Sequence, residues 1–441
     1  MGATVSYIKG KSGWLFLDND RNGVIDEISG KHAGSEALAA SWCALFAARN
    51  LEARSRNVSL TTFIVPNKHC ALARYLPDSV TVSENRLAAR IQANAPASVV
   101  YGVDLLGSDA CFHKNDTHWT DYGAYLAFGA IMQAFGITPA AGIGQEAFIR
   151  KRHVGDLTHS AGTEDVLALA DEWRVAHEYD NGIIHVGRIR IHTRHDRAKT
   201  GRSLVIFGGS SSEQIISFFA HEFDSVFHFW TQAIDWDVVQ QLGCTHVLSL
   251  PRERFMVEMA SDDMTWEYRQ RNALKFLSGT GYKKENVTGF SPYFGQMSYL
   301  SAIQSLAVSL VSLHAAGNNV GEFLLHIFAM RNNTAIRDLL NCMVAMAADA
   351  ALIERVRVYL LAEEFAQLSE AGKRSFNAKT GNVALSSLDA NALRDSAIAL
   401  EDKDLMKAEY LMSLAAACRP TGPVIASKLE FYRQEIARKE I

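Results

Sequence analysis

The sequence predicts an α/β domain followed by an all-helical domain, and three observations along its 441 residues support this. Up to about residue 250, short apolar runs alternate with helical stretches, which is typical of a doubly wound parallel sheet with helices on both faces. Between about residues 140 and 200 this pattern changes, and we expect a β insertion there. After about Tyr293 the strand-like runs nearly vanish. The expected domains are therefore residues 1–292 and 293–441.

Strands of the first domain are expected where short apolar runs are rich in β-branched or aromatic residues. These runs cover residues 60–65, 98–101, 203–207, 225–229 and 245–250. The expected helices cover residues 35–55, 83–94, 121–135 and 211–220, with Ser83 and Asp121 as N-caps. A crudely alternating stretch at residues 183–192 predicts a strand or hairpin inserted before the strand at 203–207.

The second domain is expected to consist of helices joined by short connectors. The helical stretches cover residues 299–316, 320–330, 334–371 and 390–400, and the connectors cover 317–319 and 331–333. From Asp404 to Tyr432 the sequence predicts a helical hairpin that resembles one tetratricopeptide helix pair. The small Ala408, the intervening Pro420 and an aromatic residue in the second helix are the features that fit this repeat.

The bulk composition is that of a globular protein with ample material for a core, at 48% hydrophobic and 21% charged residues. The net charge of -4 shows no basic bias, so we expect no nucleic-acid partner. The most apolar stretch, residues 299–316, is interrupted by serines, a glutamine and a histidine. It therefore predicts a buried helix and no membrane span.

The N-terminus and the cysteines predict a cytoplasmic location. Residues 1–11 lack a basic segment followed by an apolar one, so no signal peptide is expected. The six cysteines are dispersed without a C-x-x-C pair, which indicates reduced thiols. A periplasmic location is the alternative if the chain is a trimmed piece of a longer protein.

Asp116 and His118 are the first candidate site residues. Two positions apart on an extended segment, their side chains project to the same side. The carboxylate can then accept from Nδ1 of the imidazole and leave Nε2 free to take a proton. Trp119 would form a wall of the site. Two alternatives stay open: a turn aspartate beside a satisfied, partly buried histidine, or a zinc or iron site made by His113, Asp116 and His118. We expect no metal.

Ser210 is the candidate nucleophile. It follows an apolar strand, and Gly208 and Gly209 permit a tight turn before a helix capped by Ser211 or Ser212. A serine there gains from the helix dipole and from free backbone N–H groups that can bind an oxyanion. The alternative is a Gly-Ser turn that only caps the helix or cradles a phosphate. With Asp116 and His118 it completes the parts of an Asp-His-Ser nucleophilic site.

Six short segments, in this order, resemble the alginate O-acetyltransferase family, whose members have SGNH-hydrolase-like domains. They are Gly10–Leu17 (GKSGWLFL), Val65–His69 (VPNKH) with Tyr75–Asp78 (YLPD), Asp116–Trp119 (DTHW), Gly155–Leu157 (GDL), Gly208–Ser212 (GGSSS) and Leu250–Met256 (LPRERFM). Where this family commonly has Thr or Asp before the serine, this sequence has Gly209.

The resemblance implies a catalytic triad of Ser210, His118 and Asp116 in an SGNH-like fold. It also implies transfer of an acetyl group to or from a carbohydrate hydroxyl through an acyl-enzyme. The further oxyanion or substrate candidates are Asn67, Gly209, Lys68 and Trp119. Asn67 is the expected second oxyanion donor because it follows a strand end, and an ordinary turn at Asn67 and Lys68 is the alternative.

The last of the six segments is expected to be structural. Glu253 and Arg254 are expected to form an internal ion pair that ties the last strand to the sheet, and a role in substrate binding is the alternative.

The expected partners follow from this chemistry. A carbohydrate acceptor or an acetylated carbohydrate would be the substrate, and a protein partner could bind the helical C-terminus. No Gly-rich nucleotide fingerprint is present, so no tightly bound cofactor is expected and acetyl-CoA is one candidate acetyl donor. The sequence does not separate a transferase from an esterase. The alternative functions are a non-catalytic SGNH-like binding or scaffolding protein and a metal-dependent hydrolase.

Overall fold

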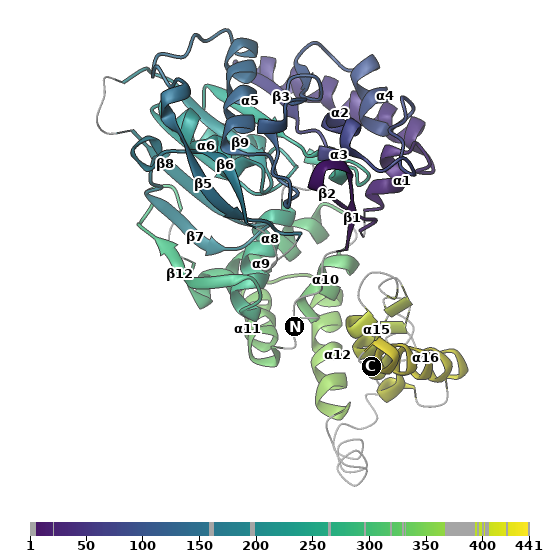
Figure 1. Ribbon diagram of the computed structural model, residues 1–441. Coiled ribbons are helices and arrows are strands. Elements are labelled where there is room, and N and C mark those ends of the chain that lie inside the picture. The colour runs from purple at the N-terminus through teal and green to yellow at the C-terminus, as the bar shows by residue number, and fades with distance from the viewer. Residues whose placement is uncertain are drawn as a thin grey trace. The chain divides into compact units, whose positions relative to one another are not determined.

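A computed structural model describes most of the chain, and its contacts divide the chain into two compact units (Figure 1). The described residues are 6–20, 22–157, 163–194, 199–262, 266–294, 297–317, 320–328, 330, 332–366, 393–394, 397–398, 401, 405–419 and 422–439. The first unit comprises Met1–Tyr268 and Gly281–Gln296, and the second comprises Arg269–Thr280 and Met297–Ile441.

The first unit is built on an eight-stranded sheet in the order β12-β7-β8-β10-β9-β11-β3-β4. Five neighbouring strands run parallel: β10 (Ser225–Phe229), β9 (Ser203–Gly208), β11 (His246–Leu250), β3 (Ser59–Ile64) and β4 (Val99–Tyr101). These are the five strands expected from the sequence, within two residues at each end. The α/β class is thus confirmed.

The sheet is mixed, whereas the sequence predicted a parallel one. Three antiparallel strands extend it beyond β10, namely β8 (Ile189–Thr193), β7 (Tyr179–Ile183) and β12 (Tyr282–Thr288). The alternating stretch at 183–192 spans the end of β7, a turn and most of β8, so it is part of a hairpin. The inserted region therefore widens the sheet, because edge strands joined by a short turn pair antiparallel.

Helices cover both faces of this sheet (Figure 1). They are α1 (Val24–Ile28), α2 (Ser35–Ser55), α3 (Lys68–Ala71), α4 (Leu87–Asn94), α5 (Asp121–Ala134), α6 (Ser212–Ala220) and α7 (Trp236–Gln241). Successive strand residues point to opposite faces. Phe63 packs in a cluster with residues of α5 and α6, and Ile64 packs in a cluster with α2 and α4.

Two of the predicted helix starts are wrong. The N-cap of α5 is Thr120, whose hydroxyl accepts from the Gly123 N–H at 3.1 Å, while the Asp121 carboxylate accepts from Leu169 N and pairs with Arg174. Helix α4 begins at Leu87. Ser83 instead accepts from the N–H of Asn85 in the turn that precedes it.

Two antiparallel hairpins were not predicted. The first joins β1 (Tyr7–Lys9) to β2 (Leu15–Leu17), with a short 3-10 turn, η1 (Lys11–Gly13), between them. The second joins β5 (Phe148–Val154) to β6 (Thr163–Leu169) as a separate two-stranded sheet. Both lie in the first unit, and the second contributes to the candidate site.

The second unit is helical throughout its described residues. It contains most of α8 (Trp266–Ser278), then α9 (Tyr299–Ala315), α10 (Gly321–Phe328), α11 (Asn333–Ala345), α12 (Ala350–Ala366), α15 (Leu405–Cys418) and α16 (Pro423–Lys439). The single helix expected at 334–371 is two helices, because Ala347 adopts a left-handed conformation with φ 53° that interrupts the helical path. Helices α15 and α16 pack together, with Ala408 and Tyr432 both fully buried.

Some expectations fall on residues outside the described ranges. The helix expected at 390–400 lies mostly there, as do Asp404, Pro420, Arg331 and the asparagines of the 317–319 connector. The comparison with a tetratricopeptide pair stays a prediction. No helix in the described part of the chain combines the length and the apolar character needed to cross a membrane.

Candidate active site

Three neighbouring parallel strands place the candidate site beyond their carboxyl ends. Strands β9, β11 and β3 lie side by side, and their carboxyl ends lead directly into Ser210, Arg252 and Asn67. Ligands of open α/β sheets bind beyond the carboxyl ends of such strands. His118 reaches these strand ends from the loop before α5, where Phe112 forms a β-bridge with Trp119.

Ser210, His118 and Asp116 form one continuous chain of hydrogen bonds. Nε2 of His118 lies 2.8 Å from Oγ of Ser210, and Nδ1 of His118 lies 2.8 Å from Oδ1 of Asp116. Ser210 and His118 are both partly exposed, while Asp116 is buried. The nucleophile candidate therefore faces solvent and the carboxylate stays inside, as acyl transfer by a serine requires.

The Asp116 carboxylate is held from two sides. Oδ1 accepts from the backbone N–H and from Nδ1 of His118, while Oδ2 accepts from Nε2 of His153 at 3.0 Å and from the N–H of Asp156 at 3.1 Å. Burial alone would raise the pKa of Asp116, but the hydrogen bonds from His118 and His153 outweigh it and hold the pKa well below its usual range. The carboxylate therefore stays ionised at neutral pH.

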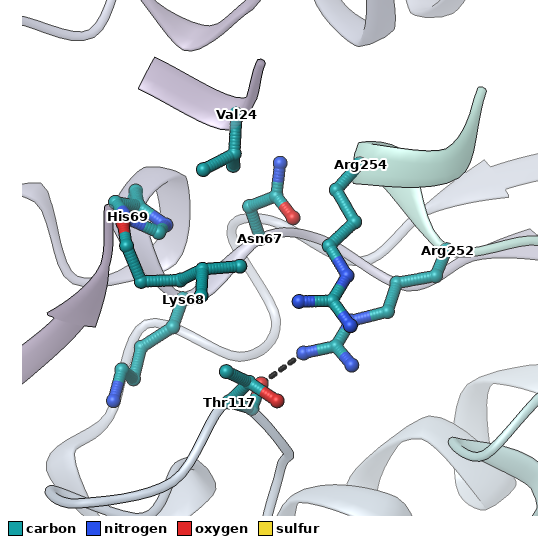
Figure 2. A pocket seen from close by; sticks show the side chains of 8 residues that line it. Val24, Asn67, Lys68, His69, Thr117, Arg252 and Arg254 are labelled. Carbon is teal, nitrogen blue, oxygen red and sulfur yellow. Dashed lines mark hydrogen bonds between the residues drawn. The ribbon is translucent and has the colours of Figure 1, made fainter. Parts of the chain in front are cut away.

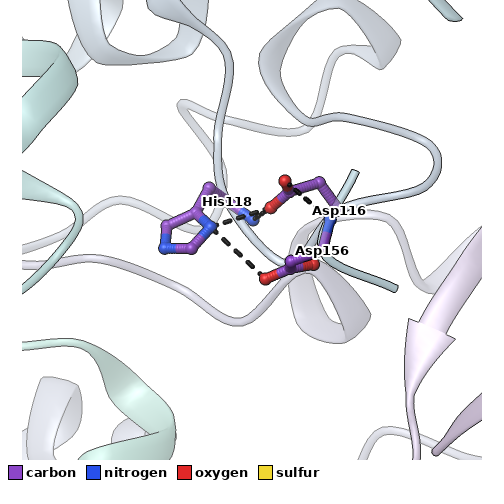
Figure 3. A group of neighbouring side chains, drawn as sticks. All are labelled: Asp116, His118 and Asp156. Carbon is purple, nitrogen blue, oxygen red and sulfur yellow. Dashed lines mark hydrogen bonds and ion pairs between the residues drawn. The ribbon is translucent and has the colours of Figure 1, made fainter. Parts of the chain in front are cut away.

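Asp156 lies beside Asp116 and His118 (Figure 3) and holds Thr117, the residue between them. Its carboxylate accepts from the N–H of Thr117 at 2.8 Å and from the Thr117 hydroxyl at 2.6 Å. Oδ2 of Asp156 also lies 3.6 Å from Nδ1 of His118. The family resemblance of Gly155–Leu157 gave no role for Asp156.

Gly155 permits this close approach. An added Cβ there would lie 1.9 Å from the carbonyl oxygen of Asn115, a distance that no side chain can occupy. The neighbouring Leu157 N–H donates to the same carbonyl at 3.1 Å. The end of the β5–β6 hairpin strand therefore lies against the 115–118 loop, which carries Asp156 and His153 to Asp116.

Asp116, His118 and Asp156 also have ligand atoms within 4.8 Å of one another, which is close enough to hold a metal ion. The donors already on Asp116 and Asp156 compete with such a role, since both Asp116 oxygens accept N–H groups. His113, a ligand in the metal alternative, is not in this group. Its ring stacks on His153 with centroids 3.8 Å apart, and its Nδ1 lies 3.4 Å from Glu164.

Trp119 and Lys68 were expected to contact the substrate or the oxyanion, but both side chains are buried. Trp119 is 1% exposed and packs in the core against Phe63, so it cannot form a wall of an open site. Lys68 is also buried, and its ammonium group donates to the carbonyls of His113, Lys114 and Asp116 at 3.0, 3.2 and 2.7 Å. Burial lowers the pKa of Lys68 to about 7, with the Asp116 charge opposing the change. Lys68 therefore anchors the loop that carries Asp116.

The expected pair between Glu253 and Arg254 is wrong. Glu253 is fully buried and lies 3.5 Å from Nε of Arg86. Its carboxylate also accepts from the hydroxyl of Tyr101 at 2.8 Å and from the backbone N–H of Asn67 at 2.6 Å. Glu253 thus ties β11 to the start of α3, and Arg254 turns into a small cavity described below.

Asn67, the expected oxyanion donor, also lines that cavity. Its side chain is buried, and none of its described hydrogen bonds reaches Ser210. The cavity is lined by Leu17, Val24, Asn67, Lys68, His69, Thr117, Arg252 and Arg254 (Figure 2). It therefore lies on the Thr117 side of the hydrogen-bond chain, and Ser210 is not among its lining residues.

Trp230 lies beside the nucleophile and was missed from the sequence. A Cβ built on Gly209 would lie 3.5 Å from Nε1 of Trp230. Trp230 is half-buried at the end of β10, and its ring meets that of His185 edge-on with centroids 5.3 Å apart. The only sequence signal was the position of Trp230 directly after a predicted strand. The indole of Trp230 therefore borders the turn that carries Ser210.

Two backbone N–H groups next to the nucleophile are available to a ligand. Ser210 and Ser211 precede α6, and in the described part of the chain neither backbone N–H donates to another residue. Ser211 is the N-cap residue, but its side chain makes no capping hydrogen bond. The start of α6 therefore presents free donors at the positive end of a helix.

Comparison with known proteins identifies this domain. Residues 7–181 match the family model described as "SGNH hydrolase-like domain, acetyltransferase AlgX". Residues 7–181 are therefore similar to this acetyltransferase domain. The match contains Asp116 and His118 and ends before Ser210, so the blocks at 208–212 and 250–256 lie beyond it. The family resemblance seen in the sequence is confirmed.

Solved structures of similar proteins have low sequence identity to the chain. PatB1 of Bacillus cereus with a sulfonyl adduct is 14% identical with a TM-score of 0.44, over 58% of this chain and 97% of that one. The O-acetyltransferase domain of Pseudomonas putida AlgJ is 18% identical with a TM-score of 0.40, over 61% and 99%. Pseudomonas aeruginosa AlgX is 13% identical with a TM-score of 0.34, over 64% and 69%. No curated protein sequence matches the chain.

Proposed function

We propose that the chain is a serine-dependent carbohydrate O-acetyltransferase or acetylesterase that works through an acyl-enzyme on Ser210. The observation that carries the proposal is the hydrogen-bond chain from Ser210 through both ring nitrogens of His118 to Asp116. A serine hydroxyl is a weak nucleophile until a neighbouring base takes its proton. The acetyltransferase description of the matched family supports the reaction class.

In the first half-reaction His118 acts as the base. Its Nε2 takes the proton of Ser210 as Oγ attacks the carbonyl carbon of an acetyl ester or thioester. The ionised Asp116 stabilises the imidazolium that forms. His118 then gives the proton to the departing oxygen or sulfur, and the acetyl group stays on Ser210.

Donors around the nucleophile would stabilise the oxyanion. The backbone N–H groups of Ser210 and Ser211 lie at the start of α6, where the helix dipole also favours negative charge. The indole N–H of Trp230 borders the space above Gly209 and is a third candidate. We assign these donors in place of Asn67, whose side chain faces the cavity behind Thr117.

In the second half-reaction an acceptor hydroxyl loses its proton to Nε2 of His118 and attacks the acetyl carbon. The product is an O-acetylated acceptor, or acetate if water is the acceptor, and Ser210 regains its proton from His118. The rings of Trp230 and His185 offer an apolar surface with polar edges beside Ser210. This surface suits a sugar ring, whose C–H faces are apolar and whose rim carries hydroxyl groups.

We also propose an acetyl donor and a cytoplasmic location for the protein. No tightly bound cofactor is needed for this chemistry, since the acetyl group arrives on its donor. A cytoplasmic enzyme has acetyl-CoA at hand, so acetyl-CoA is the first donor to test, beside an aryl acetate.

The test uses a fluorophosphonate or sulfonyl-fluoride probe on the full-length protein, with intact-mass analysis and aryl acetate turnover as readouts. We expect one adduct on Ser210, no adduct on Ser210→Ala, and turnover lowered by about 10⁴-fold or more in Ser210→Ala and His118→Ala. Ser211→Ala is the matched control and should be labelled like the wild type. Full turnover in Ser210→Ala would exclude this serine as nucleophile.

The same experiment separates the alternative functions. A folded wild-type protein that takes no probe and cleaves no acetyl ester would support a non-catalytic binding or scaffolding protein. Turnover that disappears on chelation, together with one bound metal per chain, would support a metal-dependent hydrolase. We expect labelling and turnover to be unchanged by chelator.

A further inference from the structure

The cavity behind Thr117 is lined by two neighbouring arginines, one buried and one half-buried, and neither makes a direct ion pair with a described residue. Arg252 is 6% exposed, and Arg254 lines the same cavity beside it (Figure 2). Neither guanidinium forms an ion pair with any described residue. Burial and the adjacent Arg254 charge lower the pKa of Arg252 to about 9. Two like charges held together out of water are costly unless something of opposite charge lies between them.

Several hydrogen-bond donors around this cavity have no acceptor. Arg252 donates one N–H to the carbonyl of Thr117, but its Nε and Nη1 have no partner. Nε of Arg254 and the side-chain nitrogen of Asn67 are likewise buried without a partner. Buried polar groups are nearly always satisfied in native proteins, so four orphaned donors at one cavity indicate a missing acceptor.

The nearby carboxylates cannot supply that acceptor. Asp116 and Asp156 are occupied by the donors of His118, His153 and Thr117. Asp20, the other acid whose charge reaches Arg252 and Arg254, accepts from the backbone and side-chain N–H groups of its own neighbour Asn22. The acceptor must therefore come from solution.

The size of the cavity limits its occupant. Its volume of about 10 Å³ suits an occupant the size of a single atom or a water. The positive charge of two arginines disfavours a cation and favours an anion over neutral water. We propose that this cavity is a halide site that takes chloride, bound by Arg252, Arg254 and Asn67.

The site would support the catalytic loop without touching the substrate. Arg252 holds the carbonyl of Thr117, the residue between Asp116 and His118. An anion bound between Arg252 and Arg254 would offset part of their charge, keep both side chains in place and thereby steady that loop. Chloride would thus act as a structural ligand of the first unit.

The test compares chloride with gluconate at constant ionic strength, which removes general screening effects. We expect a saturable rise in Tm of about 2–4 °C at ~10-fold excess of chloride over its Kd, with bromide acting alike. Arg254→Gln should lose this rise. Arg150→Gln, which removes an exposed arginine from β5, is the control and should keep it.

A second measurement tests the proposal even if the Arg254→Gln variant does not fold. Wild-type crystals grown in bromide should show an anomalous peak between Arg252, Arg254 and Asn67. Equal Tm values in chloride and gluconate, or a water in the cavity without a bromide signal, would overturn the proposal. Both readouts are independent of turnover, so they stand apart from the proposed acyl transfer.

Discussion

At the scale of single residues, the carboxylate of Asp116 is kept in one orientation by hydrogen bonds to both of its oxygens. One oxygen faces His118, and the other is held by His153 and by the backbone of Asp156. The side chain therefore cannot rotate away from the imidazole without losing two further hydrogen bonds. In a triad this orientation selects the histidine tautomer that leaves Nε2 free for the serine proton.

A pH-dependent role follows for His153. Its hydrogen bond to Asp116 is the main cause that raises the pKa of His153 above its unfolded value. A raised pKa contributes stability that is fully present below about pH 6.5 and is lost as the pH rises through the folded pKa. His153→Gln should therefore lower the free energy of unfolding by about 1 kcal/mol at pH 6 and by clearly less at pH 9. Urea unfolding at both pH values measures this.

Arg152→Gln serves as the control for this series, because Arg152 is exposed on the same strand and keeps its charge from pH 6 to 9. Its effect should stay within about 0.5 kcal/mol and should not change with pH. An equal loss at pH 6 and pH 9 in His153→Gln would show that the charge on His153 does not stabilise the fold.

At the scale of elements, the short helix α3 joins strand β3 to the loop that carries Asp116 and His118 through Lys68. The three donors of its ammonium group meet three carbonyls of residues 113–116. Lys68→Met would leave these carbonyls without donors, and we expect it to lower the free energy of unfolding by about 2–3 kcal/mol and to reduce turnover. Lys114→Met, an exposed lysine in the same loop, should change stability by less than about 0.5 kcal/mol. Chemical denaturation and aryl acetate turnover check both.

Elements with an unambiguous apolar pattern could be predicted from the sequence. The strand at 225–229 and the helix at 35–55 match in every residue, because each is a periodic apolar run between clear breaks. The hairpin that contains β5 could not, since residues such as Arg150 and Arg152 on its exposed face hide the alternation. At the start of α5, Thr120 and Asp121 are both good caps, and only the backbone conformation selects Thr120.

The same contrast holds for the candidate site. The meeting of Ser210 with His118 and Asp116 could be predicted, because strand ends and spacing place them at one edge of the sheet. His153 and Asp156 could not, since they reach Asp116 only after the β5–β6 hairpin folds back. Trp119 was misplaced because a sequence motif gives no information on which side of the loop faces the core.

At the scale of the whole molecule, the division into two units predicts separate functions for them. The candidate site lies entirely in the first unit. A chain that ends after Gln296 should fold and should take the serine probe at Ser210 at a rate within about threefold of the full chain. Its stability should be lower, because residues Arg269–Thr280, which include most of α8, group with the second unit and lose those partners.

Thermal unfolding and intact-mass labelling of the shortened chain test this division. A soluble, folded protein that takes up the probe is the expected result. A chain that is unfolded or unlabelled would mean that the helical unit completes the catalytic one.

The close approach at Gly155 sets a condition for anyone who would graft this chemistry onto another scaffold. Copying the serine, the histidine and the aspartate would reproduce the proposed triad but not the hairpin strand that lies against the 115–118 loop. Even one methyl group at residue 155 would separate the two backbones. A transplant would therefore have to include the glycine and its hairpin, and libraries that vary this turn should recover glycine almost alone.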